Sequence, residues 1–383
     1  MPWYLALAAS LLLAPLVLCW VDMVAPLRAA VRRPPHLAAG ASADFNVLVP
    51  IYGSINYLEN VEYLRDYGDR VVLCTTDAET APFYRRLTAI AEANGFRIFY
   101  GPPGTEGRRT VGRRDTGGTT RDRLVRDALQ TLTASYVVCI DADTVTERRL
   151  DDLVATMAAR GLDIASVPLH PGNQVNWLTR IQRHEYRLAM SLRRVMPWMV
   201  CGGCHAGRTH ALAHVMREHS LFFQGNDIEI GVLGKKLGYT VGHVPFPVPT
   251  AVPSTPRDWL RQRCAWAGGE FRLFIVNAGT ALRHPFMWLY GIVIMFLGLP
   301  LRWYSITVDP LAVIGVLIVY LVFVLAISWS ARDRWLLALP LYAAFTSLFL
   351  LAIALPAYAR MAVRSKNWGR IRIGRPTRRR RAS

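Results

Sequence analysis

Short apolar runs alternate with segments of helical spacing through the middle of the chain. The runs predict buried strands at Phe45–Tyr52, Val71–Thr75, Arg97–Tyr100 and Val137–Ile140. Helix-compatible segments lie between them, at Ile55–Tyr67, Pro82–Asn94 and Thr120–Thr133. Strands that alternate with helices predict an α/β fold with a doubly wound, mostly parallel sheet.

Longer apolar runs with almost no charge flank this part of the chain. They are Leu5–Val21, Pro285–Leu301, Pro310–Ser328 and Trp335–Tyr358, and the mean hydropathy of the whole chain is +0.21. Such runs predict membrane spans. Basic residues follow the first run and none precedes it, which indicates an uncleaved anchor whose C-terminal side faces the cytosol. Retention of the Arg-rich C-terminus on that same side requires an even number of C-terminal spans.

This pattern divides the chain into five parts. We expect an N-terminal anchor at 1–25, a linker at 26–43, a cytosolic domain at 44–283, a membrane region at 284–363 and a basic cytosolic tail at 364–383. Within the domain, Asn176–Trp198 has the composition of an amphipathic helix, either at the membrane interface or on the domain surface. The predicted location is the cell (plasma) membrane, in a multi-pass protein.

The formal net charge of +18 raises the question of a nucleic-acid partner. Much of the basic charge instead lies beside apolar runs, at Arg28, Arg32 and Arg33 and again from Arg360 to Arg381. The domain carries no aromatic-interleaved basic stripe or recognition-helix pattern. We therefore expect membrane lipids, and not nucleic acid, as partners of these charges.

Two acids follow the most apolar of the short runs. Asp141 and Asp143 come directly after Val137–Ile140, and in an extended segment residues i and i+2 project to the same side. An open α/β sheet binds its ligand at this edge, and two carboxylates suit Mg²⁺ or Mn²⁺ with a diphosphate. The alternative is an Asx-type turn. A phosphatase of the D-x-D-x-T type is disfavoured because Val145 occupies the position of its threonine.

Other polar groups have the composition of binding sites. Gly117–Thr120 followed by Arg121 combines a flexible loop, hydroxyl groups and a cation at a helix start, which suits phosphate, although an ordinary turn has the same composition. Cys201 and Cys204 have metal or redox spacing, but no second pair accompanies them, and the six cysteines of the chain predict reduced thiols.

The order of several motifs resembles that of the membrane-embedded family 2 glycosyltransferases, the group of hyaluronan, chitin and cellulose synthases. The matching segments are Val49–Tyr52, Thr76–Asp77, Asp141–Asp143, Gly225–Glu229, Gln262–Trp266 and Trp368–Arg370. The resemblance implies a GT-A-like domain inserted between transmembrane helices. It also implies transfer of a sugar from a UDP-sugar.

The resemblance assigns roles to individual residues. It places Pro50, Tyr52, Asp77, Gln262, Arg263 and Trp266, together with Asp141, at the nucleotide-sugar, and the loop composition described above adds Arg121. The metal ligands would be Asp141 and Asp143, with Mg²⁺ or Mn²⁺ as the cofactor. Asp227 would be the base that deprotonates the acceptor hydroxyl, and its alternative role is a helix N-cap. Trp266 could stack on the acceptor sugar, or lie at the membrane interface.

Two positions depart from the family pattern. Asn226 stands where an acid is usual, and Ala265 stands where the arginine of Q-x-x-R-W is expected. In a helix, Arg261 lies one turn before Ala265 on the same face, whereas Arg263 is turned about 200° away. We hypothesise that Arg261 supplies the missing cation to the diphosphate; its alternative partner is a lipid headgroup.

The resulting prediction is an inverting, metal-dependent transfer from a UDP-sugar to a growing polysaccharide, processive and coupled to export. A non-processive enzyme with a lipid-linked acceptor is the nearest alternative. A catalytically impaired membrane scaffold that keeps the fold is the alternative from another class, because of Asn226 and Ala265.

Overall fold

The computed structural model describes residues 44–103, 120–194, 196–219, 226–277, 310–328 and 333–346, with a few isolated residues between 27 and 356. The N-terminal apolar run, the Gly101–Gly118 loop beyond residue 103, Gly225, the run Pro285–Leu301 and the C-terminal tail lie outside the described residues. The predicted division into five parts therefore stays a prediction.

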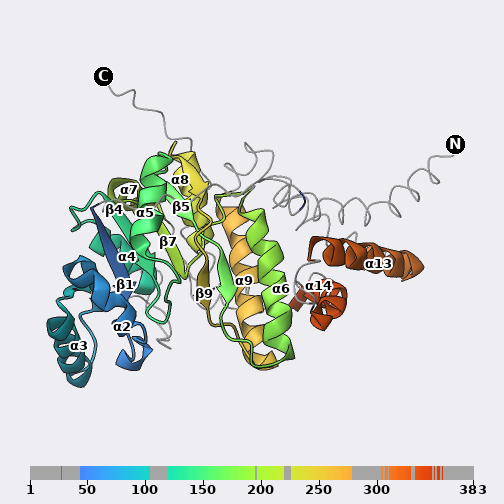
Figure 1. Cartoon of the computed structure of the whole chain (residues 1–383), viewed down its shortest axis with the longest axis horizontal. Coiled ribbons are helices and arrows are strands. Elements are labelled where there is room, and N and C mark those ends of the chain that lie inside the picture. The colour runs from blue at the N-terminus through green and yellow to red at the C-terminus, as the bar shows by residue number, and fades with distance from the viewer. Residues whose placement is uncertain are drawn as a thin grey trace.

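A seven-stranded sheet forms the centre of the molecule (Figure 1). Its order is β3 (Arg97–Gly101), β2 (Val71–Thr76), β1 (Phe45–Pro50), β4 (Tyr136–Ile140), β7 (Cys204–Arg208), β5 (Ile164–Ser166) and β8 (Val241–His243). β7 is antiparallel to β4 and β5, and the other pairs are parallel. The predicted doubly wound, mostly parallel sheet is confirmed.

Helices cover both faces of this sheet because its central strands are apolar on both sides. β1, β2 and β4 are buried along their whole lengths. One face packs against α3 (Ala81–Asn94) and α5 (Leu150–Ala159). The other packs against α4 (Thr120–Leu129), α7 (Thr209–Glu218) and α8 (Asn226–Lys236). Burial on both faces is the reason these strands read as continuous apolar runs.

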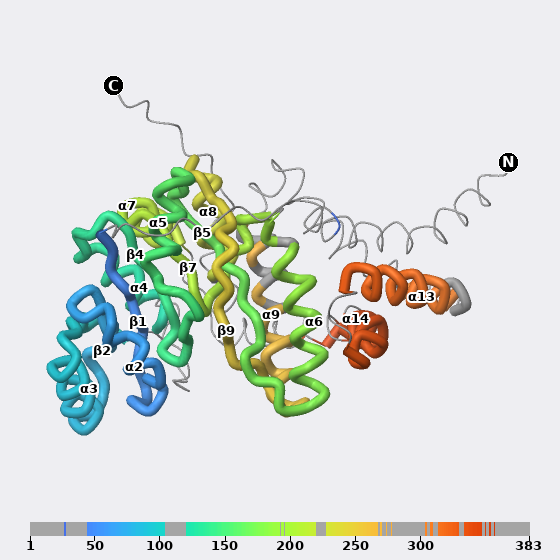
Figure 2. Tube along the Cα trace, in the orientation of Figure 1, coloured from blue at the N-terminus to red at the C-terminus, as the bar shows by residue number. Residues whose placement is uncertain are grey.

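Two long helices lie side by side next to the sheet domain (Figure 2). They are α6 (Trp177–Leu192) and α9 (Pro256–Val276). The strand β6 (Leu169–Pro171) precedes α6 and β9 (Val248–Thr250) precedes α9, and these two strands pair to form the second sheet. Glu185 of α6 accepts a hydrogen bond from Arg263 of α9 at 2.7 Å. Tyr342 of α14 (Leu339–Phe345) donates to the same carboxylate at 2.8 Å, which ties the three helices together.

The predicted helix Ile55–Tyr67 is wrong in one respect, because the segment is broken. It consists of the 3-10 turn η1 (Ile55–Tyr57), the short α2 (Val61–Leu64) and a second 3-10 segment, η2 (Arg65–Arg70). The break contains Asn60, whose side-chain amide donates to the carbonyl groups of Asp141 at 3.0 Å and Thr144 at 2.7 Å. These long-range hydrogen bonds replace continued helix and fix the loop that follows β4.

The predicted multi-pass location is contradicted, since no helix among the described residues is long and apolar enough to cross a membrane. The run from Pro310 forms α13 (Pro310–Ile327), whose 18 residues span about 27 Å, less than the roughly 30 Å hydrocarbon core of a bilayer. The last run begins with a 3-10 turn, η5 (Arg334–Ala338), which leads into the seven-residue α14. α6 buries Leu178 and Ile181 within the chain, as the domain-surface alternative for that helix requires.

Candidate active site

The candidate site lies where β1, β2 and β4 end. In a parallel sheet the carboxyl ends of strands meet at one edge, and ligands bind there. β7 runs in the opposite direction, so its beginning, and the preceding Gly202 and Gly203, reach the same edge. The amide of Asp141 donates to the carbonyl of Gly203 at 3.0 Å, which fixes the two segments against each other.

The D-x-D segment forms a turn instead of a continued strand. The amide of Thr144 donates to the carbonyl of Asp141 at 3.0 Å, which closes a turn over four residues. Asp143 is exposed, and its carboxylate accepts a hydrogen bond from the Thr144 hydroxyl at 3.2 Å. Asp143 therefore presents a carboxylate to solvent at the sheet edge, while Asp141 lies deeper.

Arg121 lies at the start of α4 and contacts both sides of this edge. Its Nε donates to Asp141 Oδ1 at 2.9 Å, and its Nη2 lies 2.8 Å from the same oxygen. Nη2 also donates to the carbonyl of Gly202 at 2.5 Å. The guanidinium is only about one-fifth exposed, so solvent screens this ion pair weakly.

Asp227, at the first turn of α8, lies beside the Gly202–Gly203 pair. A Cβ built on Gly202 would lie 3.4 Å from Asp227 Oδ2, and one built on Gly203 would lie 3.8 Å from Asp141 Oδ2. Each glycine therefore lies next to one of the two carboxylates, and the lack of side chains lets both carboxylates approach the loop. The carboxylates that the sequence predicts as metal ligand and base thus lie beside adjacent residues of one loop.

The electrostatic surroundings of Asp227 differ from those of Asp141. Burial raises the pKa of the Asp227 carboxyl above its ordinary value, and the positive charges of Arg193 and Arg121 oppose this shift. Asp141, in contrast, has a guanidinium in direct contact. A carboxylate with a raised pKa is the better proton acceptor near neutral pH.

A buried histidine lies behind the loop. His205 of β7 is 1% exposed, and its Nδ1 lies 3.1 Å from the carbonyl of Cys201. Burial, followed by the charge of Arg121, lowers the pKa of His205 to about 3. The ring is therefore neutral at physiological pH and adds no further positive charge behind the site.

The remaining predicted donor-site residues lie on several elements. Pro50 is the buried last residue of β1, and Tyr52, partly buried, packs against the core. Asp77 is exposed just after β2, with its amide donating to the carbonyl of Gly101 at 2.9 Å. Pro50 ends β1, Tyr52 follows it, and Asp77 follows β2, so all three lie at the edge of the sheet where the site is.

The Gln262–Trp266 motif lies on α9. Arg263 is buried against Glu185, and its guanidinium lies 4.7 Å from the centroid of the Trp266 ring. Trp266 is 42% exposed and lies 6.2 Å from the ring of Tyr186. The Gln262 Oε1 atom is buried without a hydrogen-bond partner among the described residues. The Arg261 side chain is 71% exposed, and its Nη1 lies 3.5 Å from Asp258 Oδ1 on the same helix, so in the described part of the chain it pairs with Asp258 and not with Asp141 or Asp227.

Sequence reasoning missed three residues at this site. Asn60, Gly202 and Gly203 have contacts that depend on the tertiary fold, and none belongs to a motif that the resemblance used. One signal was available, since the glycine pair lies inside the Cys201–Cys204 spacing that was weighed as a metal or redox site. Burial raises the pKa of both thiols above the ordinary value, which disfavours thiolate chemistry there.

A solved structure with a similar fold is the mannosyltransferase PcManGT from Pyrobaculum calidifontis, in complex with GDP-Man and Mn²⁺. The TM-score is 0.53, and the alignment covers 94% of this chain and 99% of that one. At 18% sequence identity this similarity concerns the fold alone, and it confirms the GT-A-like sheet. It provides no support for insertion between transmembrane helices.

Two curated relatives carry the name N-acetylglucosaminyltransferase. The protein of Bradyrhizobium diazoefficiens is 30% identical over 161 residues, which are 38% of this chain and 33% of that protein. The protein of Rhizobium meliloti is 32% identical over 110 residues, 25% of this chain and 26% of that protein. The chain thus matches about a third or less of the length of these relatives.

The family described as "Glycosyl transferase family group 2" matches residues 136–359, more than half of the 383 residues. The matched region includes β4 with its D-x-D turn, the glycine pair, α8 with Asp227 and the α9 motif. The chain therefore belongs to glycosyl transferase family group 2, as the order of its motifs predicted.

Proposed function

We propose that the chain transfers a sugar from a UDP-sugar to a hydroxyl group of a carbohydrate acceptor, with inversion at the anomeric carbon. The observation that carries this proposal is the placement of two carboxylates beside the adjacent residues Gly202 and Gly203. Asp141 with its ion-paired Arg121 suits a diphosphate, and Asp227 suits an attacking hydroxyl. An inverting displacement requires leaving group and nucleophile on opposite faces of the reacting carbon.

A divalent ion, Mg²⁺ or Mn²⁺, would be held by Asp143 with Asp141. The donor set fits, because Asp143 offers an exposed carboxylate at the sheet edge and both cations prefer oxygen ligands shared with substrate phosphates. When bound, the ion would neutralise negative charge on the diphosphate. The Mn²⁺ of PcManGT agrees with this class of cofactor.

The chain's own residues provide the rest of the leaving-group site. Arg121 holds a positive charge against Asp141 and Gly202, at the place where the diphosphate would gain charge. Pro50, Tyr52 and Asp77 would line the nucleoside part of the donor. Arg261, which directly precedes the Gln262–Trp266 motif, stays our candidate for the cation that Ala265 lacks, since its guanidinium is exposed and its ion pair with Asp258 lies at the surface.

The Asp227 carboxylate would remove the proton of the acceptor hydroxyl as that oxygen attacks. Burial raises the pKa of this carboxyl, and the ionised form is the active one, so transfer should increase as the pH rises through that pKa. The exposed Trp266 ring, packed on Tyr186, offers a flat apolar face to an acceptor sugar.

The acceptor we favour is a growing polysaccharide, extended processively. Coupling to export depended on the predicted spans and is not part of the proposal. A single transfer to a lipid-linked acceptor is the second candidate, and product length separates the two. A catalytically impaired form would bind the nucleotide in a metal-dependent manner without turnover.

The decisive experiment incubates the purified chain with UDP-sugars and Mg²⁺ or Mn²⁺, and measures UDP release and product length. UDP-N-acetylglucosamine is the first donor to test because the curated relatives are N-acetylglucosaminyltransferases, and GDP-mannose is the matched alternative nucleotide. We expect metal-dependent UDP release that Asp227→Asn abolishes without loss of UDP binding. Release that is unaffected by EDTA and by Asp227→Asn would contradict the proposal.

A further inference from the structure

Glu185 is a largely buried carboxylate to which side chains of two other helices are hydrogen-bonded. Arg263 of α9 donates from Nη2 to its Oε2 at 2.7 Å, and the Tyr342 hydroxyl of α14 donates to the same oxygen at 2.8 Å. The indole Nε1 of Trp259, also on α9, donates to the Tyr342 hydroxyl at 2.8 Å. The Glu185 and Arg263 side chains are 24% and 8% exposed, so solvent screens their attraction weakly. The carboxylate therefore fixes the Arg263 guanidinium between α6 and α9.

Stability alone does not account for this ion pair. Burial of two charges costs hydration free energy that their attraction often only offsets, and apolar residues of similar volume are frequently as stabilising or more so. The Nε atom of Arg263 is in addition buried without a hydrogen-bond partner among the described residues. Retention of a charged pair at this cost indicates that the placement of the guanidinium has a use beyond packing.

The guanidinium of Arg263 lies over the ring of Trp266. Trp266 comes three residues later, on the next turn of α9, and the guanidinium carbon lies 4.7 Å from the centroid of its ring. This distance is within the roughly 6 Å range of a cation–π contact. Tyr186, the residue after Glu185, is 5% exposed, and its ring lies 6.2 Å from that of Trp266. Two consecutive residues of α6 thus hold the indole, Tyr186 directly and Glu185 through Arg263.

The indole of Trp266 is nevertheless 42% exposed, although tryptophan is highly buried on average and the groups that hold this one are buried. A ring that buried groups cover on one side and that is open to solvent elsewhere presents a flat apolar surface in a fixed orientation. Such a surface suits the C–H face of a sugar ring.

The position of Trp266 on α9 relates it to the base that we propose. α9 packs against α8, the helix that carries Asp227. Leu273, two turns after Trp266 and on the same side of α9, lies in the core cluster that contains Ile230 of α8. Trp266 is therefore on the side of α9 that faces the helix of Asp227.

We propose that Arg263 is a positioning residue for the acceptor, held by Glu185 so that its guanidinium fixes the Trp266 ring for stacking on an acceptor sugar. The inference rests on the proposed function, in which Trp266 meets the acceptor. A ring that is already ordered loses less freedom when the sugar binds, and immobilisation of one such side chain lowers affinity roughly two- to tenfold. Arg263 then acts on the acceptor, whereas the motif resemblance assigns it to the nucleotide-sugar.

The test replaces the ion pair without leaving an unpaired buried charge. In the double variant Arg263→Gln with Glu185→Gln, two amides can keep a hydrogen bond between α6 and α9 while the cation is lost. Arg257→Gln, a change at an exposed arginine of the same helix, is the matched control. Each protein is labelled with fluorinated tryptophan, and the Trp266 fluorine resonance is assigned by its loss in Trp266→Phe.

The probe is a short β-linked N-acetylglucosamine oligosaccharide, chosen because the curated relatives are N-acetylglucosaminyltransferases. We expect it to shift the Trp266 resonance in the parent and in Arg257→Gln, and to bind the double variant roughly two- to tenfold more weakly. UDP affinity, measured by calorimetry, should be unchanged. In a Trp266→Ala background, the two Gln changes should have no further effect on oligosaccharide affinity, because the ring that they position is absent.

The other outcomes separate this inference from the proposed function. A Trp266 resonance that does not respond to the oligosaccharide overturns the inference, as does equal oligosaccharide affinity in the parent and the double variant. Loss of UDP affinity with unchanged oligosaccharide affinity also overturns it and assigns Arg263 to the donor. A parent that releases no UDP from any UDP-sugar, but whose Trp266 resonance responds, overturns the proposed transfer while the saccharide site stands.

Circular dichroism identifies a double variant that does not fold. Arg263→Lys, which keeps a charge beside Glu185 but loses the planar guanidinium, then takes its place. The same weakening of oligosaccharide binding is expected, and unchanged affinity again overturns the inference.

Discussion

The substitution Gly231→Ala tests how Asp227, the base that we propose, is held in place. Gly231 lies in α8, four residues after Asp227 and so one turn further along the same side of the helix. A Cβ at this position would lie 2.0 Å from the carbonyl oxygen of Trp198, whereas ordinary contacts begin near 3.4 Å. The helix and the Trp198 segment would have to separate by roughly 1.4 Å, the difference between these two distances. Both groups are backbone, so no side-chain rotation can relieve the overlap.

Two effects of opposite sign determine how Gly231→Ala changes the free energy of unfolding. Helix propensity alone predicts that alanine stabilises α8 by about 0.5–1 kcal/mol. Overpacking of a closed interior typically costs about 1–3 kcal/mol. The overlap involves backbone atoms, so we expect the cost to dominate and the free energy of unfolding to fall by about 1–2 kcal/mol. A displacement of about 1 Å at a reacting group can lower turnover on the order of a hundredfold.

The assay measures urea denaturation midpoints and UDP release for parent and variant. The matched control is Gly315→Ala, in α13, where an added Cβ meets no atom within 4 Å and propensity should act alone. We expect the control to be as stable as the parent or more so, with unchanged turnover. If Gly231→Ala proves as stable and as active as the control, the close packing of α8 on Trp198 does not position Asp227.

Three further predictions follow from the site. Asp143→Asn, or chelation of the metal, should abolish transfer without unfolding the chain, and UDP release in the folded variant would contradict its role as metal ligand. Asp227→Asn should lower turnover on the order of a hundredfold or more, leave UDP affinity intact by calorimetry, and stabilise the fold near neutral pH, because burial raises the pKa of this carboxyl and so penalises its ionised form. Arg261→Ala should weaken UDP binding with little effect on stability, whereas Arg263→Ala, which leaves Glu185 without its cation, should lower the free energy of unfolding by roughly 1–3 kcal/mol. Equal UDP affinity in Arg261→Ala and the parent would remove Arg261 from the donor site.

The first half of the fold was accessible to sequence reasoning because its strands are buried on both faces. Phe45–Pro50 and Val71–Thr76 form strands within two residues of the predicted bounds, and the helix from Ala81 begins and ends as its signals indicate. Thr80 caps that helix by accepting from the amide of Phe83, and Gly95 ends it with φ of 70°.

The second half was less predictable because its strands are short and depend on non-local pairing. β5, β6, β8 and β9 have three residues each, too few for a periodic signal. β7 reads Cys-His-Ala-Gly-Arg, which has no strand pattern, yet it pairs with β4 over five residues. Its antiparallel direction carries Gly202 and Gly203 to the active edge, and no local feature of the sequence shows that direction.

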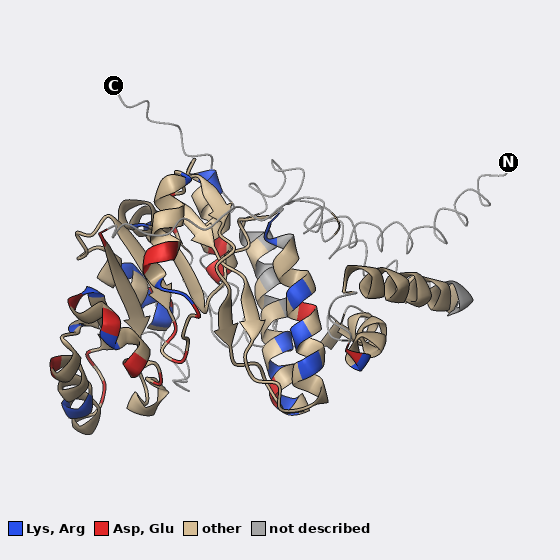
Figure 3. Ribbon diagram, viewed as in Figure 1, with Lys and Arg blue, Asp and Glu red and all other residues tan. Residues whose placement is uncertain are grey.

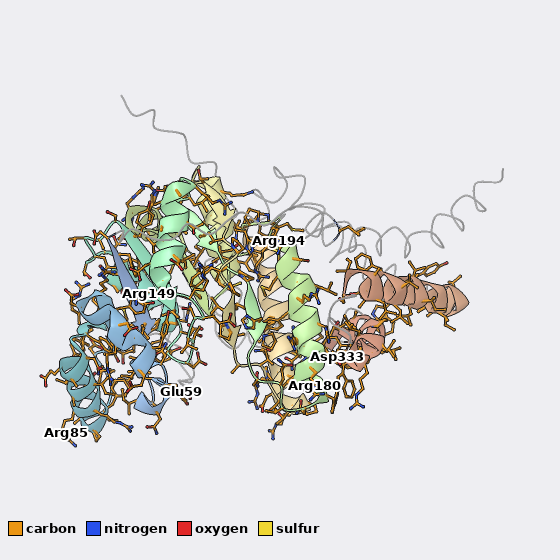
Figure 4. The ribbon with its side chains drawn as sticks, in the orientation of Figure 1. Glu59, Arg85, Arg149, Arg180, Arg194 and Asp333 are labelled. Atoms are coloured by element: carbon orange, nitrogen blue, oxygen red, sulfur yellow. The ribbon has the colours of Figure 1, made fainter. Side chains whose placement is uncertain are left out.

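Among the long apolar runs that the structure describes, the one from Trp335 was misread for a related reason. Hydropathy counts residues along the chain, but a span also requires an unbroken helix of sufficient length. Trp335 lies in a 3-10 turn, where Asp333 caps by accepting from its amide at 3.1 Å and lies 2.9 Å from His184 of α6 (Figure 4 labels Asp333). Figure 3 shows the basic residues that recur along α6, a helix that packs against this turn. Polar contacts between segments far apart in sequence interrupt the helix that composition alone predicts.

The two carboxylates at the site, Asp141 and Asp227, each lie at the end or the beginning of an element, Asp141 just after β4 and Asp227 in the first turn of α8. The fold nevertheless places them in different environments. Asp141 receives two nitrogens of Arg121 at 2.8–2.9 Å, an ion pair in which the guanidinium lies directly on the carboxylate. Asp227 is partly buried at the start of α8, and burial raises the pKa of its carboxyl above the ordinary value. Such a group can change protonation state during the reaction, as a base must. The ion pair of Asp141 and the burial of Asp227 both depend on segments far apart in the chain, so the difference is a property of the tertiary structure and not of either motif.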